Sequence, residues 1–197
     1  AMLKNHENVF IRDELDGKIW MERYLTKEYI CEHFIDEELD YAELMTDAAR
    51  YVYSSGDYLR YLYIAADGVT NDFASDRAET YVSVILGEET LDEIIESVSK
   101  KDGRITVTSV LSSKNLEALA EDGVTAGKFE YVLDAKTREM ISVISDCTYD
   151  DGSAFHAITE MTYDAEVPEM LREFLEYVNQ TENLRNVTVV SNPGTEK

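Results

Sequence analysis

Three histidines and two cysteines are the residues best suited to metal or nucleophile chemistry. They are His6, His33, His156, Cys31 and Cys147. His33 and His156 fall in segments with a strand pattern and could meet across a sheet, where Glu32 or Glu160 would complete a transition-metal site. Isolated histidines in strands are far more often ordinary packing residues. We therefore predict neither a metal site nor a cofactor.

The two cysteines form no C-x-x-C pair, which excludes the usual zinc and dithiol redox motifs. Each lies in a segment that reads as a strand. One long-range disulfide would suit an exported protein. Two buried free thiols are the alternative, because unpaired cysteine is among the most buried residue types.

Asp146, Asp150 and Asp151 before Gly152 could supply oxygen ligands for calcium. An EF-hand loop needs glycine where this sequence has Asp151, so that motif is excluded. Asp151-Gly152 is instead typical of a hairpin turn.

Acid–base catalysis is not indicated by any specific pair of side chains. With 41 Asp and Glu residues in 197, some carboxylates lie close together by chance. The sequence contains no G-x-S-x-G nucleophile elbow and no glycine loop that could hold phosphate. We therefore predict no catalytic residues and a protein that is not an enzyme.

Tyrosines provide the most suggestive binding feature, because each has an apolar ring and a polar tip. Tyr58 belongs to a cluster of them between residues 51 and 63. Tyrosine also favours strands, so ordinary sheet composition is the alternative. The predicted ligand-binding residues are Trp20, Tyr24, Tyr51, Tyr53, Tyr61 and Tyr63.

Alternating apolar residues and turn signals predict a strand-rich first third. Asp16-Gly17 is a strong two-residue hairpin signal, and Ser55-Gly56-Asp57 predicts another turn. The predicted strands are residues 8–15, 18–25, 28–35, 41–45, 50–54 and 58–65. Several have apolar residues on both faces, so both faces are covered or one lines an apolar cavity.

A helical period replaces the alternation near the middle of the chain. It predicts one helix over 78–86 and a second from Thr90, which pairs with Glu93 in a capping box, to a cap at Gly103. Later, the sequence predicts strands at 105–111, 129–133, 140–149, 154–163 and 186–190, and a short helix at 115–120. Pro168 predicts the start of a last helix, and its inward residues are Leu171, Phe174, Leu175 and Val178.

Strands followed by segregated helices predict an α+β fold. We expect a curved antiparallel sheet, an unclosed half-barrel, with helices packed on its concave face. The expected organisation is one domain over 1–197, with an N-terminal arm at 1–7 and a loose tail or edge strand at 180–197.

The chain is strongly acidic, with 18 Lys and Arg against 41 Asp and Glu and a formal charge of −23. That charge disfavours nucleic acid and anionic membrane surfaces as partners. No apolar run approaches the roughly 18 residues of a membrane span. From its two ends we expect a trimmed fragment whose targeting region has been removed.

Several short motifs resemble small bacterial surface lipoproteins of the lipoprotein-carrier and lipoprotein-receptor superfamily. The motifs are Trp20-x-x-x-Tyr24-x-Thr26-x-x-Tyr29, Tyr131 to Thr137, Tyr149-Asp150-Asp151-Gly152, and Tyr163 with Val167-Pro168. The resemblance runs from Phe10 to Val178. It implies export, a half-barrel around helices and no catalytic set, and its carrier members bind acyl chains inside the half-barrel. A lipidated cysteine is not in this segment, because Cys31 lies too deep in a strand.

We therefore expect an exported, non-enzymatic lipoprotein domain at the cell surface or envelope. It would bind a hydrophobic or amphiphilic ligand between sheet and helices, and contact a membrane only through an anchor outside this segment. The alternative is a cell-surface module that binds another protein and has no internal ligand.

Overall fold

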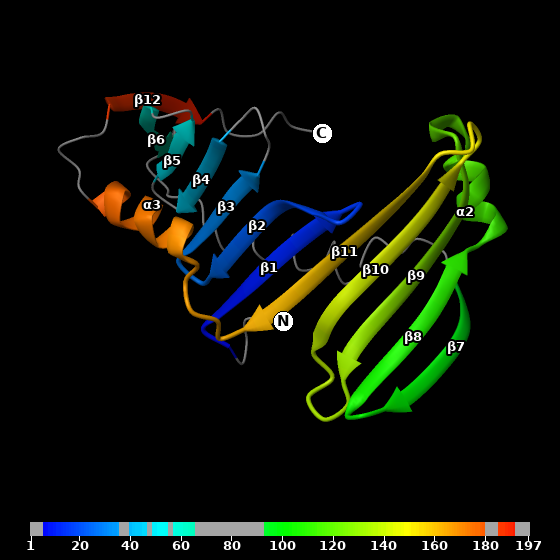
Figure 1. Cartoon of the computed structure of the whole chain (residues 1–197). Helices are drawn as coiled ribbons and strands as arrows, with labels where there is room; N and C mark the ends of the chain where they lie inside the picture. The colour runs from blue at the N-terminus through cyan, green and yellow to red at the C-terminus, as the bar shows by residue number, and fades with distance from the viewer. Residues whose placement is uncertain are drawn as a thin grey trace. The chain divides into compact units, whose positions relative to one another are not determined.

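A twelve-stranded sheet forms the framework of the computed structural model, which describes residues 6–35, 40–46, 49–54, 57–65, 93–179 and 185–191 (Figure 1). The strand order is β12-β6-β5-β4-β3-β2-β1-β11-β10-β9-β8-β7, so the sheet is unclosed. Apart from the parallel pair β6 and β12, the strand pairs with a described register are antiparallel. The strands are β1 (Asn8–Leu15), β2 (Lys18–Thr26), β3 (Tyr29–Ile35), β4 (Asp40–Thr46), β5 (Ala49–Ser54), β6 (Asp57–Ala65), β7 (Glu93–Lys101), β8 (Arg104–Leu111), β9 (Val124–Asp134), β10 (Met140–Tyr149), β11 (Ala154–Tyr163) and β12 (Arg185–Ser191).

The chain divides into two compact units. The first unit comprises Ala1–Phe10, Met21–Val82 and Tyr163–Lys197, and the second comprises Ile11–Trp20 and Ser83–Thr162. Within the described residues, the first unit is built around β3 to β6 and the second around β7 to β10.

The predicted strands of the first 65 residues are confirmed, with ends that move by at most one residue. The Asp16-Gly17 turn joins β1 to β2 with φ of 50° and 79°. Positive φ at both central residues is the requirement of a type I′ turn, which Asp-Gly meets at little steric cost. The last predicted strand is also confirmed, since β12 is an edge strand.

The helix predicted to end at Gly103 is wrong, because its described residues form strand β7. Asp102 and Gly103 have φ of 50° and 76°, and Lys101 pairs with Arg104, so this Asp-Gly is a second two-residue hairpin. The β-branched residues that suggested a helix face also favour a strand. The helix predicted over 78–86 lies outside the described residues.

Three short helical segments complete the described structure. Helix α2 (Ser113–Ala118) begins after Ser112, whose hydroxyl accepts a hydrogen bond from the Asn115 N–H at 3.3 Å. It is two residues earlier than predicted, and the 3-10 turn η2 (Ala120–Asp122) follows it. Helix α3 (Glu169–Asn179) follows Pro168 as predicted. No described helix has the length and apolar character needed to cross a membrane.

In the first unit, α3 covers one face of the sheet. Its Leu171 and Phe174 are 0% and 4% exposed and lie in one cluster with Tyr24, Cys31 and Leu44 from β2, β3 and β4. This confirms the predicted inward positions of Leu171 and Phe174 in α3. Burying such side chains stabilises the fold by about 1.5–3 kcal/mol each.

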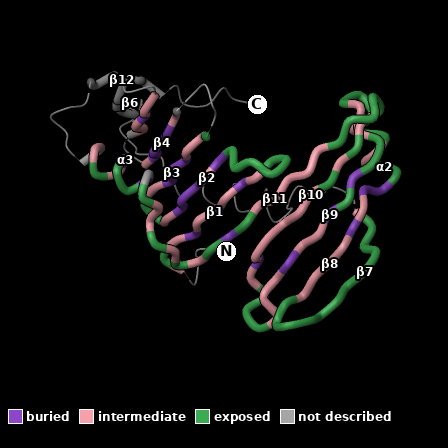
Figure 2. The backbone as a smooth tube through the Cα atoms, viewed as in Figure 1, coloured by how far each residue is buried: buried purple, intermediate pink, exposed green. Residues whose placement is uncertain are grey.

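The alternate residues of the same strands are buried as well. They include Leu25, Ile30 and Met45, each 0% exposed. Figure 2 shows this burial as the purple stretches of β1 to β4. Side chains on both faces of β2 to β4 are therefore buried.

Glu43 is a buried acid on β4 and is held by Arg50 and Tyr41. Arg50 Nε lies 2.5 Å from one carboxylate oxygen, and the Tyr41 hydroxyl donates to the other at 2.8 Å. Burial opposes the charge of Arg50, but the hydrogen bonds and charge of Glu43 outweigh it and raise the pKa of Arg50. A buried carboxylate is tolerated here because it is paired and hydrogen-bonded.

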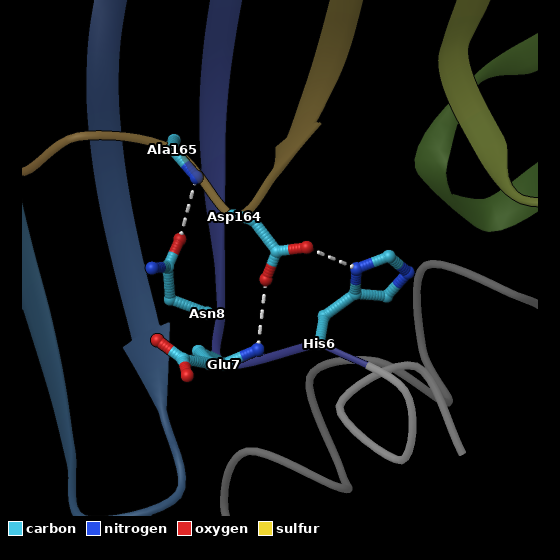
Figure 3. Close-up of polar contacts among 5 residues, drawn as sticks. All are labelled: His6, Glu7, Asn8, Asp164 and Ala165. Carbon is cyan, nitrogen blue, oxygen red and sulfur yellow. Dashed lines mark hydrogen bonds and ion pairs between the residues drawn. The ribbon is translucent and has the colours of Figure 1, made fainter.

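A group of hydrogen bonds, which we call the clasp, joins residues 6–8 to Asp164 and Ala165 in the loop after β11 (Figure 3). Asp164 accepts from the Glu7 N–H at 2.8 Å and lies 2.8 Å from His6 Nδ1. The Ala165 N–H donates to the Asn8 side-chain oxygen at 2.8 Å. Asp164 adopts φ of 51°, a left-handed conformation that Asp and Asn tolerate. These bonds connect residues more than 150 positions apart in sequence.

We expect Asp164→Asn to lower the melting temperature at pH 7 by a few degrees, on the order of 2 °C. The hydrogen bond to His6 and those to backbone N–H groups lower the pKa of Asp164, so its contribution is present above the usual Asp pKa and is lost as the pH falls through the native value. Circular dichroism melts at pH 7 and pH 3 check this. An equal difference between wild type and variant at both pH values contradicts it.

Candidate functional site

The six aromatic residues predicted from the sequence lie in β2, β5 and β6. Tyr24, Tyr51 and Tyr53 are brought together in the cluster around α3. Trp20 belongs to the other unit and is 40% exposed. Tyr61 and Tyr63 lie in β6, opposite Arg50 and Val189, and their side chains are outside the described residues.

Tyr24 takes part in the core with both its ring and its hydroxyl. It is 4% exposed, its ring lies 6.2 Å from that of Tyr29, and its hydroxyl donates to the Ala165 carbonyl at 3.3 Å. Burial raises the pKa of Tyr29 to about 12. The tyrosines next to α3 therefore contribute to the packing of the first unit, and any role in ligand contact stays a prediction.

The histidines and cysteines have separate places in the fold. His6 belongs to the clasp, and His156 Nδ1 lies 2.7 Å from Asp146 on the neighbouring strand. Cys31 and Cys147 are free thiols, and burial raises the pKa of each. Cys31 is 0% exposed, in agreement with the expectation that it is no lipidation site. Among the described residues, no group of three His, Cys, Asp or Glu could hold a metal ion.

The second unit contains a sheet whose two faces differ in charge. Strand register pairs Val107 with Tyr131, Tyr131 with Val143, and Val143 with Thr159, so these side chains share one face. Alternation extends this face along β8 to β11. We call it the uncharged face, and its residues are Ile105, Val107, Ser109, Leu111, Phe129, Tyr131, Leu133, Val143, Ser145, Cys147, Phe155, Ala157 and Thr159.

The reverse face takes every charged residue of β8 to β11. By the same register, Lys128 lies opposite Asp146, which lies opposite His156. The remaining members are Arg104, Glu130, Asp134 and Glu160. A charged face on one side and an uncharged one on the other is the usual pattern of an antiparallel sheet with one solvated side.

The uncharged face is only partly covered within its own unit. Helix α2 lies against β8 and β9, and Leu111 and Phe129 are 6% and 8% exposed. Elsewhere on this face the side chains of Val107, Leu133 and Val143 are only partly buried. Figure 2 shows the contrast, with β8 to β11 mostly intermediate and β1 to β4 more buried. A face of apolar side chains that remains accessible is a candidate binding surface.

One carboxylate reaches this otherwise uncharged face from β7. Glu93 accepts a hydrogen bond from the Tyr131 hydroxyl at 2.7 Å and a second from the Ser109 hydroxyl. Ser109 is 1% exposed. Burial, and then the hydrogen bond to Glu93, raises the pKa of Tyr131, which therefore stays a neutral donor at physiological pH. This trio could orient the polar end of an amphiphilic molecule.

The sequence contained a signal for this face that the aromatic count missed. Phe129, Tyr131 and Leu133 alternate with Lys128 and Glu130. This period of two shows which side chains of a strand share the uncharged side. The number of tyrosines favoured a binding site in the first unit, whereas the positions of the charged residues favour one in the second.

Comparison with known proteins gives low-identity structural neighbours. No protein-family model matches the sequence, and no curated protein matches it. The chain is similar to the Mycobacterium tuberculosis lipoprotein LppX, with 9% identity and a TM-score of 0.45 over 84% of this chain and 90% of that one.

Two MucB structures are also similar. MucB in complex with MucA(peri) has 14% identity and a TM-score of 0.27, and 83% of this chain and 52% of the matched chain are covered. The Pseudomonas aeruginosa MucA/MucB complex has 15% identity and a TM-score of 0.27, with 84% and 55% covered. The chain thus spans about half the length of the matched chain in each complex.

We expect the imidazole of His156 to titrate above the usual histidine pKa of about 6.5. The hydrogen bond that the His156 imidazole donates to Asp146 raises the pKa of His156, so the pair stabilises the fold below pH 6.5 and this contribution is lost as the pH rises through the native value. NMR titration of the imidazole protons checks this. Asp146→Asn should lower the pKa of His156, and a wild-type value at or below 6.5 contradicts the pairing.

Gly127 is the position where β9 approaches Leu111 most closely. A Cβ at Gly127 would lie 2.6 Å from Leu111 Cδ1 and 2.8 Å from Cγ. We expect Gly127→Ala to destabilise the protein by about 1–3 kcal/mol, because the core beside α2 has no room for a methyl group. Urea unfolding checks this, with exposed Ala126→Ser as the control. In the double variant Gly127→Ala/Leu111→Ala, the loss of stability should be smaller than the sum of the losses in the two single variants. Strict additivity would argue against the clash.

Proposed function

We propose that this chain is an extracytoplasmic, non-enzymatic, lipoprotein-type binding domain that takes a hydrophobic or amphiphilic small molecule on its uncharged face. The observation that supports this most strongly is the segregation of charge. Strands β8 to β11 place all their charged residues on one face and leave the other apolar and partly accessible. Apolar surface that stays in contact with water costs about 25 cal/mol per Å², and a ligand recovers that cost.

The chemical character of this face favours an elongated apolar molecule. Tyr131 and Phe155 provide partly accessible aromatic surface, and the buried ring of Phe129 lies 6.4 Å from that of Tyr131 in a stacked arrangement. Ligand sites commonly combine such an apolar lining with a few polar groups that fix orientation. Glu93 and Tyr131 would supply those groups for a polar head, and the buried Ser109 hydroxyl would hold Glu93 in position.

The broader setting of the proposal follows from the family resemblance of the sequence. It includes export to the cell surface or envelope, a curved half-barrel with helices on its concave face, and one functional domain over 1–197. Trp20, Tyr24, Tyr51, Tyr53, Tyr61 and Tyr63 remain the contacts predicted for a ligand held between sheet and helices, which is an alternative position to the uncharged face. The high negative charge supports a ligand that is neutral or cationic, because anionic amphiphiles would be repelled.

Binding of the neutral apolar dye N-phenyl-1-naphthylamine tests this proposal. We expect its emission to rise on addition of the protein, and Val107→Lys to weaken the apparent affinity by about tenfold or more, equivalent to about 1.4 kcal/mol. Val107 is on the uncharged face.

Thr108→Lys is the matched control, since Thr108 is the next residue of β8 and lies on the reverse face opposite Glu130. It should bind the dye like the wild type, and circular dichroism should show both variants folded. Equal loss in the two variants, or no dye binding by the wild type, would rule out this face as the site.

A protein-binding module is the second candidate. The observation that favours it is the exposure of large apolar side chains on β7, where Ile94, Ile95 and Val98 are 56%, 63% and 64% exposed. Exposed apolar groups at a sheet edge are common at protein interfaces.

A further inference from the structure

Strand β7 has the most exposed large apolar side chains among the described residues. Ile94, Ile95 and Val98 exceed half exposure, whereas the other exposed large hydrophobic residues are near 40%. From Ile94 to Lys101, every residue of this nine-residue strand is exposed. Isolated surface hydrophobics need no explanation, but three on one edge strand do.

β7 is also a terminal strand of the sheet. It is hydrogen-bonded to β8 on one side and ends the strand order on the other. An edge strand presents a row of backbone donors and acceptors to a further strand. Proteins usually protect such edges by keeping the strand short or by placing proline or charged residues in it. β7 has nine residues and no proline. In the part of the chain that the structure describes, this edge is protected by a register irregularity between Ile95 and Ser97 and by its charged residues.

The charges of β7 are arranged by sign along the strand. Glu93 and Glu96 precede the centre, and Lys100 and Lys101 follow it. When two identical strands of this kind pair antiparallel, the acidic half of each lies beside the basic half of the other. Such self-complementarity is the property that a twofold interface requires. It is notable in a chain of charge −23, whose copies otherwise repel one another.

We propose that a second copy of this chain pairs with β7 through its own β7, antiparallel and about a twofold axis at Val98. In this register Val98 lies opposite Val98, and Glu96 of each copy lies opposite Lys100 of the other. Each cross-strand pair of opposite charge, and the central β-branched pair, contributes about 0.2–1 kcal/mol. The pairing also removes Val98 from water. The pairing does not require a ligand, although Val98 lies opposite Val107 and therefore on the same side of the sheet as the uncharged face.

A charge-swap series measured by sedimentation velocity tests the pairing. We expect the wild type to be in a concentration-dependent monomer–dimer equilibrium. Glu96→Lys and Lys100→Glu should each weaken dimerisation by about tenfold, because each replaces two attractive pairs by two repulsive ones. The double variant E96K/K100E should return to within about twofold of the wild type, since the signs are exchanged but still complementary.

Helix α2 offers a matched control. Lys114 and Glu117 are exposed and three residues apart, so K114E and E117K repeat the same changes of net charge away from β7. These variants should dimerise like the wild type. Hydrogen exchange provides a second readout, with amides of β7 better protected at high protein concentration.

Three results would overturn the proposal. A wild type that stays monomeric up to about 100 μM rejects pairing between two copies and favours a strand of another protein as the partner of β7. A double variant as weak as the single ones rejects the Glu96–Lys100 pairing. Equal effects of the α2 control variants would assign the change to net charge alone.

Discussion

The alternation of side chains across a β-strand is the constraint on which the rest of this structure depends. A shift of one residue in register would move every charged residue of β9 to β11 to the opposite face. The two Asp-Gly turns fix the register of the strands they join, β1 with β2 and β7 with β8, because two residues with positive φ leave only one pairing. The uncharged face is a consequence of the register of β8 to β11 as well as of their composition.

The same alternation of side chains has different results in the two units. In the first unit, α3 covers one face of the sheet, and the other face is buried even where it includes Glu43. In the second unit, α2 is six residues long, and the uncharged face around Val143 stays partly accessible. Packing thus accounts for stability in the first unit, while the second retains apolar surface that a ligand can bury. The proposed site therefore belongs to the second unit, whereas the tyrosine-rich strands β5 and β6 belong to the first.

Much of the fold could be predicted from the sequence because its signals are local. Asp16-Gly17, Pro168 and the alternation over 140–149 each specify backbone geometry within a few residues, and the structure follows them. The segment 93–101 was mistaken for a helix because Ile94, Ile95 and Val98 fit a period of 3.6 as well as a strand. Asp102-Gly103 was the better guide, since it demands a hairpin.

The candidate site was less predictable, because it depends on pairing between strands that are distant in sequence. Tyr131 meets Glu93 across 38 residues, and the neighbours of Val143 are set by register on both sides. The number of aromatic residues predicted Tyr24 as a ligand contact, whereas the structure places it in the buried cluster with α3. Register, which requires the structure, identified the face that excludes charge.

The most direct test of the account is to locate the ligand on the protein. A neutral long-chain alcohol bearing a diazirine would be bound, photolysed, and its attachment sites mapped by mass spectrometry. The account predicts adducts on the uncharged face, at residues such as Val107, Tyr131 and Val143. Adducts confined to the reverse face or to the cluster around α3 would contradict it.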